Sequence, residues 1–148
     1  MRLTKKVLLL GGSGILGSAI IKSKLFEKLD CPSKIKLNLL ERSSINKFLK
    51  NRYDLVINCA AIARMNECEK NPLKAIETNV FGTLNLIQEI IDYGISSNKK
   101  IKLIHVSTDG VYPSIKGNYN EKTEARPYNI YGWIKLCSED IVKTLKNH

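Results

Sequence analysis

Long hydrophobic runs are absent from this chain of 148 residues. No apolar stretch approaches the about 20 residues that a membrane-spanning helix needs. The N-terminus faintly resembles a signal peptide, but its apolar run stops at Gly11 and no small-residue cleavage site follows, so we do not interpret it as one. Repeats and low-complexity tracts are also missing. We therefore expect a cytoplasmic protein with no membrane partner, and the length suits one domain of about 100–200 residues.

Cysteine is scarce, and its four copies are scattered. Cys31, Cys59, Cys68 and Cys137 form no C-x-x-C pair. Zinc sites and disulfide frameworks usually show closely spaced cysteines. The sequence thus predicts no metal site and four reduced, mostly buried thiols.

Acidic residues are outnumbered by basic ones, 14 against 24, which gives a formal net charge of +10. Such a surplus can indicate binding to nucleic acid or another polyanion. However, the longest basic runs are the pairs Lys5-Lys6 and Lys99-Lys100, and the aromatic residues that stack on bases make up only 7%. We favour a solvated lysine-rich surface and no nucleic acid partner. The polyanion alternative predicts a DNA affinity that falls steeply with salt.

Short apolar runs alternate with amphipathic stretches, which is typical of βαβ units and a parallel sheet. The predicted fold class is α/β, with a Rossmann-type doubly wound parallel sheet. The strands are expected at residues 6–10, 54–60 and 101–107. The helices are expected at residues 14–28, after the cap Ser43-Ser44, from Asn71-Pro72 to Gly94, and from Pro127 almost to the end. Residues 35–39 indicate a short strand or an extended loop, and residues 108–126 a loop.

Glycines follow the first predicted strand directly. The segment from Gly11 to Gly17 fits both G-x-x-G-x-x-G and G-x-G-x-x-G. Between a strand and a helix, the first glycine of such a motif allows a tight turn. Gly14 lets the backbone approach a pyrophosphate, and Gly17 permits close helix–strand packing. A merely flexible turn is the alternative, but this context favours a dinucleotide site.

A second group of polar residues lies in the C-terminal half, where Ser107-Thr108-Asp109 ends a strand and a helix carries Tyr131 and Lys135. Residues four apart share a helix face. An ammonium about 5 Å from a phenol lowers the pKa of that phenol toward neutrality. A tyrosine and a lysine packed side by side on a surface helix are the alternative, and the preceding glycine loop favours the catalytic interpretation.

In this order, the motifs resemble those of the N-terminal part of the extended short-chain dehydrogenase/reductase superfamily. Within it, the chain is most similar to the dTDP-4-dehydrorhamnose reductase group of sugar-nucleotide enzymes. The segments that carry the resemblance are residues 11–17, 56–61, 66–69, 77–83, 107–109 and 127–136.

The resemblance implies NADP or NAD as the cofactor and a nucleotide-linked 4-keto-6-deoxy sugar as the substrate, in the synthesis of cell-surface polysaccharide precursors. It implies that Tyr131 protonates the C4 oxygen as hydride arrives, that Thr108 hydrogen-bonds this oxygen, and that Lys135 binds the nicotinamide ribose. Thr108 and Asp109 would contact the substrate. The implied cofactor-binding residues are Gly11, Gly14, Ile15, Leu16, Gly17, Asn38, Leu39, Ala60, Ala61, Ile62, Tyr131 and Lys135.

The chain also departs from the pattern of that family. Asn38 stands where the family usually has Asp, and Gly110 where an aromatic residue usually follows Ser-Thr-Asp. No acid stands clearly at the end of a second strand, although Glu41 and Arg42 follow, so the choice between NAD and NADP stays open.

Two further polar residues have competing interpretations. His105 lies in the middle of a predicted strand, and we interpret it as a core histidine rather than a catalyst. Arg64 can either reach a phosphate or be solvated.

Enzymes of the family continue into further strands and a substrate lobe, and nothing in residues 1–148 resembles these parts. We therefore expect one incomplete NAD(P)-binding domain, from a fragment or a shortened gene product, with the strand at 101–107 as a buried-type apolar edge. A homodimer is the oligomer to consider. The functional alternatives are a non-catalytic dinucleotide-binding regulatory subunit and a sugar-nucleotide epimerase or dehydratase.

Overall fold

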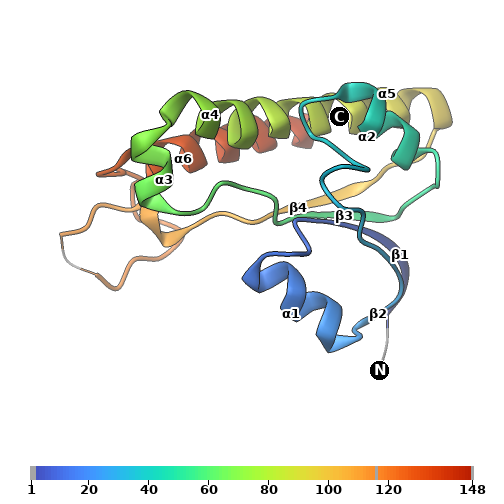
Figure 1. The fold of residues 1–148 in the computed structure, drawn as a ribbon, viewed down its shortest axis with the longest axis horizontal. Helices are drawn as coiled ribbons and strands as arrows, with labels where there is room; N and C mark the ends of the chain where they lie inside the picture. The colour runs from blue at the N-terminus through green and yellow to red at the C-terminus, as the bar shows by residue number, and fades with distance from the viewer. Residues whose placement is uncertain (1–2, 116, 148) are drawn as a thin grey trace. The chain divides into compact units, whose positions relative to one another are not determined.

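The computed structural model describes residues 3–115 and 117–147. The chain packs as two compact units. The first, the strand unit, comprises Met1–Ala60 and Asn85–Val106; the second, the helical unit, comprises Ala61–Leu84 and Ser107–His148. Figure 1 shows the order of their elements along the chain.

A parallel sheet forms the centre of the strand unit. Among the residues described, it has four strands in the order β2-β1-β3-β4. Their bounds are β1 (Leu3–Leu10), β2 (Phe26–Asp30), β3 (Leu55–Asn58) and β4 (Lys102–His105). All neighbouring pairs are parallel, so the carboxyl ends of the strands lie at one edge. The predicted parallel α/β fold is confirmed.

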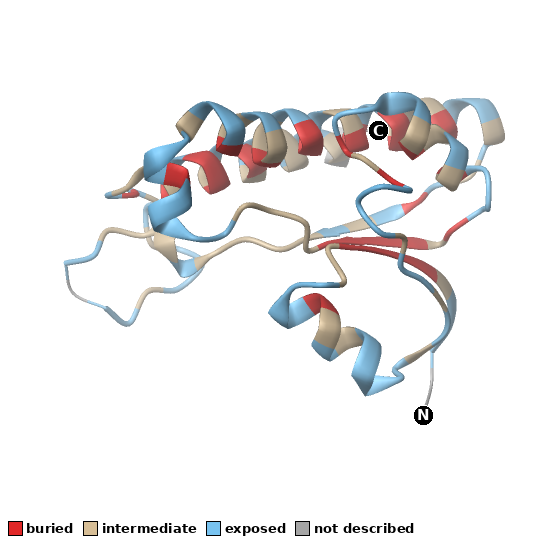
Figure 2. Cartoon of the chain, in the orientation of Figure 1, coloured by how far each residue is buried: buried red, intermediate tan, exposed pale blue. Residues whose placement is uncertain are grey.

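Both faces of this sheet are covered within the strand unit. Helix α1 (Ile15–Ser23) lies on one face, and α2 (Arg42–Leu49) and α5 (Gly82–Ser97) lie on the other (Figure 1). The face toward α1 is built from buried residues of β1 and β3, namely Val7, Leu9, Leu55 and Ile57, against which Ile20 packs. Buried residues are concentrated on β1 and β3 (Figure 2), as expected for the two central strands of a sheet with helices on both faces.

The first helix is shorter than predicted, and a strand follows it. Helix α1 ends at Ser23, because Lys24 adopts a left-handed conformation with φ 51° and caps it. Residues 26–30, expected to be partly helical, instead form β2. Since β2 is an edge strand with exposed charged residues, its burial does not alternate and its sequence lacks the period of a strand.

Residues 35–39 form turns, so the loop alternative holds and no strand lies there. Helix α2 begins after Glu41 rather than after the predicted cap Ser43-Ser44. The hydroxyl of Ser44 instead accepts a hydrogen bond from the Asn38 backbone N–H at 3.0 Å and lies 2.8 Å from the Asn38 carbonyl oxygen. Ser44, which the sequence predicted to cap the helix, therefore stabilises the preceding loop instead.

Short helices make up most of the helical unit. They are α3 (Met65–Lys70), α4 (Pro72–Ile76), the π-helical η1 (Glu77–Phe81), the 3₁₀ turn η2 (Asp109–Val111), α6 (Ile130–Lys143) and the 3₁₀ turn η3 (Thr144–Asn147). Their core gathers Cys68, Ala75 and Ile134 with partly buried neighbours. The predicted loop at 108–126 is broken only by η2, apart from residue 116, which lies outside the described residues.

The predicted helix start at Asn71-Pro72 is confirmed, with Asn71 as N-cap and Pro72 in the first turn. The predicted end at Gly94 is wrong, because α5 continues to Ser97. The residue after it, Asn98, adopts φ 52°. A left-handed residue of this kind commonly terminates a helix, and asparagine tolerates the conformation.

The last helix begins at Ile130 rather than at Pro127. Asn129 is its N-cap, and its side chain accepts a hydrogen bond from the Gly132 N–H at 2.7 Å. The predicted apolar stripe is only partly correct. Ile134 is buried, but Cys137 is exposed, and the polar Lys135 is 2% exposed.

Two expectations about burial are wrong. All four cysteines are free, but only Cys68 is buried, whereas Cys31 and Cys137 are exposed. Strand β4 lies at the edge of the sheet as predicted, yet it is not fully buried, since Ile104 is 49% exposed. In the part of the chain that the structure describes, no helix has the length and apolarity needed to cross a membrane.

Candidate functional site

The glycine loop joins β1 to α1 in the strand unit, and steric contacts explain two of its glycines. Gly11 has φ +78°, and a Cβ there would lie 2.6 Å from the Ala60 nitrogen. A Cβ on Gly17 would lie 2.3 Å from the Gly11 carbonyl oxygen. Both approaches are closer than real Cβ contacts, so only glycine fits at either position. The tight turn and the close helix packing predicted for this motif are therefore present.

The start of α1 has the features of an anion site. Gly14 is its N-cap and supplies no side-chain hydrogen bond to the first-turn amides. Ile15 and Leu16, the first two residues of the helix, are 94% and 47% exposed. Unpaired backbone N–H groups at a helix N-terminus, with the positive end of the helix dipole, favour a phosphate. The loop thus fits the pyrophosphate of a dinucleotide.

Asn58 links the carboxyl ends of β3 and β4. Its Oδ1 accepts a hydrogen bond from the Ala60 N–H at 3.1 Å, and its Nδ2 lies 3.2 Å from His105 Nδ1. Asn58 is 1% exposed, and His105 is half-buried. The contact with Asn58 favours a structural role for His105, as the sequence indicated. It also orients Ala60, one of the predicted cofactor-binding residues.

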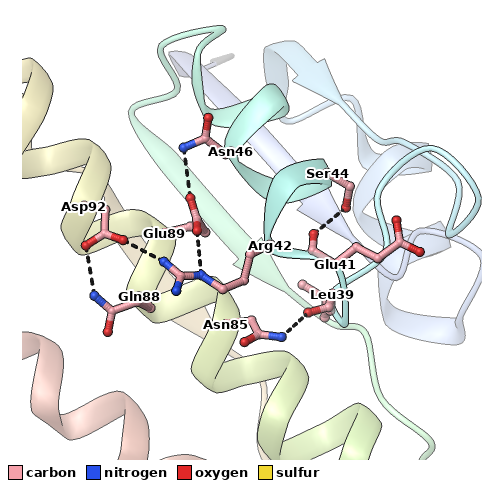
Figure 3. Close-up of polar contacts among 9 residues, drawn as sticks. All are labelled: Leu39, Glu41, Arg42, Ser44, Asn46, Asn85, Gln88, Glu89 and Asp92. Atoms are coloured by element: carbon pink, nitrogen blue, oxygen red, sulfur yellow. Dashed lines mark hydrogen bonds and ion pairs between the residues drawn. The ribbon is translucent and has the colours of Figure 1, made fainter.

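The loop with the predicted adenine contacts, Asn38 and Leu39, is held by its own neighbours. Asn38 Nδ2 donates to the Glu41 carboxylate at 3.0 Å, and Asn38 Oδ1 accepts from the Leu40 N–H at 3.1 Å. The Leu39 carbonyl accepts a hydrogen bond from Asn85 on α5 at 3.0 Å (Figure 3). The amide that replaces the family's aspartate is therefore engaged within the loop.

Arg42, at the start of α2, is engaged with acidic side chains of α5 (Figure 3). Its Nε lies 2.7 Å from Glu89 Oε1, and its Nη2 lies 2.7 Å from Asp92 Oδ2. Asn46 and Gln88 donate to the remaining oxygens of the two carboxylates, each at 2.9 Å. Arg42 thus joins α2 to α5, and its charge is compensated within the strand unit.

In the helical unit, Asn79 orients Ile62. Asn79 is 1% exposed and lies in the π-helical turn η1. Its Oδ1 accepts from the Ile62 N–H at 2.8 Å, and its Nδ2 donates to the Ile62 carbonyl at 2.9 Å. The sequence analysis included Asn79 in the segment 77–83 that carries the resemblance but gave it no role. A second signal is that asparagine is unfavourable inside an apolar helical stripe and needs hydrogen-bond partners there.

The side chains of Tyr131 and Thr108 hydrogen-bond to each other. The expectation of a lowered tyrosine pKa is not met. Burial raises the pKa of Tyr131 above its usual value, with smaller raising effects from Cys68 and Asp109, and the bond to Thr108 only partly opposes them. Tyr131 is therefore a neutral phenol over the physiological range and is suited to donate a proton.

Lys135 follows Tyr131 by one turn on α6 and is 2% exposed. Lysine is almost never fully buried in proteins unless it has a partner or a function. Its backbone carbonyl accepts a hydrogen bond from the buried Ser138 hydroxyl at 2.7 Å. The second predicted catalytic residue thus lies on the side of α6 that faces the interior.

Two contacts fix α6 against residues 107–110 of the same unit, and sequence reasoning found neither. A Cβ on Gly132 would lie 2.3 Å from the Gly110 carbonyl oxygen and 2.9 Å from Pro127 Cβ, so the first turn of α6 touches η2 directly. The Ser107 hydroxyl donates to the Glu139 carboxylate. These contacts join residues far apart in sequence. The only signal for them in the sequence was Gly132, a glycine within a predicted helix.

Arg64 lies at the start of α3. It is exposed and precedes α3 as the N-cap. It lines a surface depression with Met65, Asn66, Glu67, Lys70 and Asn71. Among the described residues, no His, Cys, Asp and Glu side chains gather in a group that could hold a metal ion.

The predicted site residues fall into two groups, one in each unit. Those of the strand unit are Gly11, Gly14, Ile15, Leu16, Gly17, Asn38, Leu39 and Ala60. Those of the helical unit are Ala61, Ile62, Thr108, Asp109, Tyr131 and Lys135.

A parallel sheet with helices on both faces and a glycine loop after its first strand defines a Rossmann-type α/β protein. The chain belongs to the RmlD substrate-binding domain family, whose model matches residues 5–148.

Three relatives illustrate this membership. The dTDP-4-dehydrorhamnose reductase of Mycolicibacterium smegmatis is 33% identical over 113 residues, which cover 74% of this chain and 32% of the relative. Methionine adenosyltransferase 2 subunit beta of Bos taurus is 28% identical, over 93% of this chain and 42% of the relative. The structure of dTDP-4-dehydrorhamnose reductase from Bacillus anthracis in complex with NADP has a TM-score of 0.82 and 25% identity, over 98% of this chain and 51% of that one.

The chain spans less than half the length of the curated relatives and about half of the solved one.

Proposed function

We propose that residues 1–148 are the dinucleotide-binding domain of a sugar-nucleotide oxidoreductase, which reduces a nucleotide-linked 4-keto-6-deoxy sugar with NADH or NADPH. The observation that carries this proposal is the neutral phenol of Tyr131, hydrogen-bonded to Thr108 and one helical turn before the buried Lys135. A relative is a dTDP-4-dehydrorhamnose reductase, and a similar structure contains NADP, which supports both the substrate class and the cofactor.

The glycine loop would hold the pyrophosphate of the dinucleotide. Gly11 and Gly17 leave no room for side chains, and the exposed first turn of α1 offers backbone N–H groups to an anion. When bound, the dinucleotide supplies the hydride. Ala60 and Ile62 are held through their backbones by Asn58 and Asn79, as expected of residues that orient a ligand.

Tyr131 would supply the proton. Addition of hydride to the C4 carbon converts the C4 oxygen into a strongly basic alkoxide, and transfer of the Tyr131 hydroxyl proton yields the alcohol and a phenolate. A phenol with a raised pKa still donates its proton to such a base, because an alkoxide binds a proton far more strongly than a phenolate does. The ammonium of Lys135 would stabilise the phenolate, and the Thr108 hydroxyl would hydrogen-bond the C4 oxygen during the transfer.

Oxidation of NADH or NADPH with a dTDP-4-keto-6-deoxyhexose tests this function. Tyr131→Phe removes only the hydroxyl, and we expect kcat to fall about 10³-fold, because general acid catalysis typically contributes 10²–10⁴-fold. Tyr128→Phe is the matched control, since Tyr128 is 62% exposed and precedes the same helix. Turnover that survives Tyr131→Phe unchanged would exclude this tyrosine as the proton donor.

A non-catalytic regulatory subunit is the second candidate, and the relative named methionine adenosyltransferase 2 subunit beta favours it. Such a protein would bind the dinucleotide without consuming it. Dinucleotide binding that persists in Tyr131→Phe, combined with no turnover in the unmodified protein, would favour this candidate over the reductase.

A further inference from the structure

Ser107 and Glu139, both in the helical unit, lie beside the predicted catalytic residues without being among them. The Ser107 hydroxyl donates a hydrogen bond to the Glu139 carboxylate, and both residues are half-buried. Ser107 directly precedes Thr108, whereas Glu139 follows Lys135 by one turn of α6. The hydrogen bond therefore connects the segment 107–110 to the helix, and each of the two carries a predicted catalytic residue.

Gly132 makes a second contact between the same helix and the same segment. A Cβ on Gly132 would lie 2.3 Å from the Gly110 carbonyl oxygen, so the two backbones touch there. Gly132 and Glu139 are separated by nearly two turns of α6, or about 10 Å along its axis. Residues seven apart lie on one face of a helix. The same face of α6 thus contacts the segment 107–110 at two points.

The two contacts lie on either side of the predicted catalytic residues. In the segment 107–110 they flank Thr108, and on α6 they flank Lys135. Tyr131, which hydrogen-bonds to Thr108, adjoins the contact at Gly132. A single contact would let the segment pivot against the helix, whereas two contacts fix its orientation. The contact made by Glu139 therefore sets the direction from which Thr108 meets Tyr131.

The other hydrogen bonds of the Thr108 side chain are local. Its hydroxyl accepts from the Gly110 N–H at 3.1 Å and lies 3.2 Å from Asp109 Oδ1. These bonds stay within the segment 107–110, so they shape it without attaching it to α6. The bond from Ser107 to Glu139 supplies the attachment.

The carboxylate of Glu139 differs from that of the next residue in the direction it faces. A hydrogen bond from a hydroxyl to a carboxylate is shorter and stronger than one between neutral groups. Asp140 is exposed and instead pairs with Lys143, with Oδ1 and Nζ 2.7 Å apart. Two adjacent carboxylates of α6 therefore have different environments, one at the segment 107–110 and one at the surface.

We propose that Glu139 is a positioning residue, which holds the Thr108 hydroxyl against Tyr131 through its hydrogen bond to Ser107. Glu139 acts through the segment 107–110 and not by contact with the substrate. Catalytic geometry is sensitive to such support, since a misplacement of about 1 Å can lower a rate about 10²-fold. The inference rests on the proposed function, because it gives Glu139 a part in the proton transfer by Tyr131.

Steady-state kinetics of Glu139→Ala and Glu139→Gln with the keto sugar test the proposal. In Glu139→Ala we expect kcat to fall about tenfold and KM to change less than about twofold, because no binding contact is removed. Glutamine retains an oxygen acceptor for the Ser107 hydroxyl, so Glu139→Gln should keep kcat within about threefold of the wild type. Asp140→Ala is the matched control, since it removes the neighbouring surface carboxylate and should leave kcat unchanged.

Ser107→Ala removes the other half of the hydrogen bond. We expect the same loss of kcat, about tenfold, and no further loss when it is combined with Glu139→Ala, because both changes remove one interaction. Unchanged kcat in Glu139→Ala, equal losses in Glu139→Ala and Glu139→Gln, or additive losses in the double variant overturn the proposal. If Glu139→Ala does not fold, Ser107→Ala, which removes a single oxygen, decides it.

The NMR resonance of the Tyr131 ring gives a measurement that does not depend on turnover. In protein with isotope-labelled tyrosine, this resonance is assigned by its loss in Tyr131→Phe, and it responds to the hydrogen bond with Thr108. We expect it to move in Glu139→Ala and to stay in place in Asp140→Ala. A merely structural Glu139 would lower the melting temperature and leave the resonance unmoved, which would refute the positioning role.

The two measurements separate a failure of this inference from a failure of the proposed function. A resonance that moves in Glu139→Ala, in a protein that does not reduce the keto sugar, would support the positioning role and refute the reductase. Reduction of the keto sugar that Glu139→Ala leaves unchanged would support the reductase and refute the role of Glu139.

Discussion

The candidate residues of the two units are positioned by different forces. In the strand unit, the contacts that require glycine at positions 11 and 17 are made with backbone atoms. In the helical unit, side-chain hydrogen bonds from Asn79, Thr108 and Ser107 position the groups expected to do chemistry. Where backbone atoms leave no space, as at Gly11 and Gly17, the loop cannot accommodate an added Cβ. Where hydrogen bonds position the side chains, the site depends on each donor and acceptor.

The difference also separates binding from chemistry. The strand unit offers backbone N–H groups at the start of α1, which suit a phosphate whatever the rest of the ligand is. The helical unit offers the half-buried phenol of Tyr131 and the buried side chain of Lys135. Substitutions can therefore damage one function and leave the other measurable.

The largest effect is expected for Gly17→Ala. Its Cβ would meet the Gly11 carbonyl oxygen at 2.3 Å, so helix α1 must move away from the loop. We expect the free energy of unfolding to fall by about 3 kcal/mol, at the upper end of overpacking costs, and dinucleotide binding to be lost. Denaturant unfolding and NADH titration measure the two effects. Gly14→Ala is the control for stability, since its Cβ would have a normal contact of 3.4 Å. Equal destabilisation by both changes would contradict the steric explanation.

Gly132→Ala should have a smaller effect, confined to the helical unit. The added Cβ would lie 2.3 Å from the Gly110 carbonyl oxygen, and α6 must shift away from Thr108. We expect a loss of about 2 kcal/mol in the free energy of unfolding. Gly94→Ala is a contrasting control, because its Cβ has room at 3.6 Å within α5, and alanine stabilises a helix interior by about 0.5–1 kcal/mol. Thermal or denaturant unfolding measures both changes, and a Gly132→Ala variant that is as stable as the wild type would show that packing against η2 is unimportant.

The smallest effect concerns a surface charge of the strand unit. The hydrogen bond from Lys99 and, next, the Lys6 backbone N–H hold the pKa of Asp54 below its usual value. The folded pKa is therefore lower than the unfolded one. The stabilisation is present above the unfolded pKa and is lost as the pH falls through the folded pKa.

For Asp54→Asn we expect a loss well under 1 kcal/mol at pH 7, as for other exposed ion pairs. The difference from the wild type should vanish in acid, where Asp54 is protonated in both states. Unfolding curves at neutral and acidic pH measure it. A difference that grows as the pH falls would reverse the assigned direction of the pKa shift.

The fold was predictable where burial is continuous. Strand β3 is buried at every residue, and the apolar run of residues 54–60 showed it. Strand β2 could not be found in the same way, because an edge strand with exposed charged residues has no clear hydrophobic period. For the same reason, the sequence did not indicate that Asp30 ends a strand of the sheet.

The candidate site was predictable where the motif is local. The glycine loop and the spacing of Tyr131 and Lys135 each lie within a few residues, so backbone geometry alone relates their members. The bonds of Asn79 to Ile62 and of Tyr53 to Asp30 join positions distant in sequence. No pattern in a single sequence indicates such pairs.

The sequence by itself determined the parallel α/β fold and the glycine loop, because both follow from local hydrophobic period and backbone sterics. The tertiary structure alone decided which side chains are buried and paired. It placed the half-buried Tyr131 beside Thr108, engaged Arg42 with Glu89 and Asp92, and hydrogen-bonded the Tyr53 hydroxyl to Asp30 at the end of β2. The physical reason is that burial and charge pairing depend on neighbours from distant segments, which come together only when the chain folds.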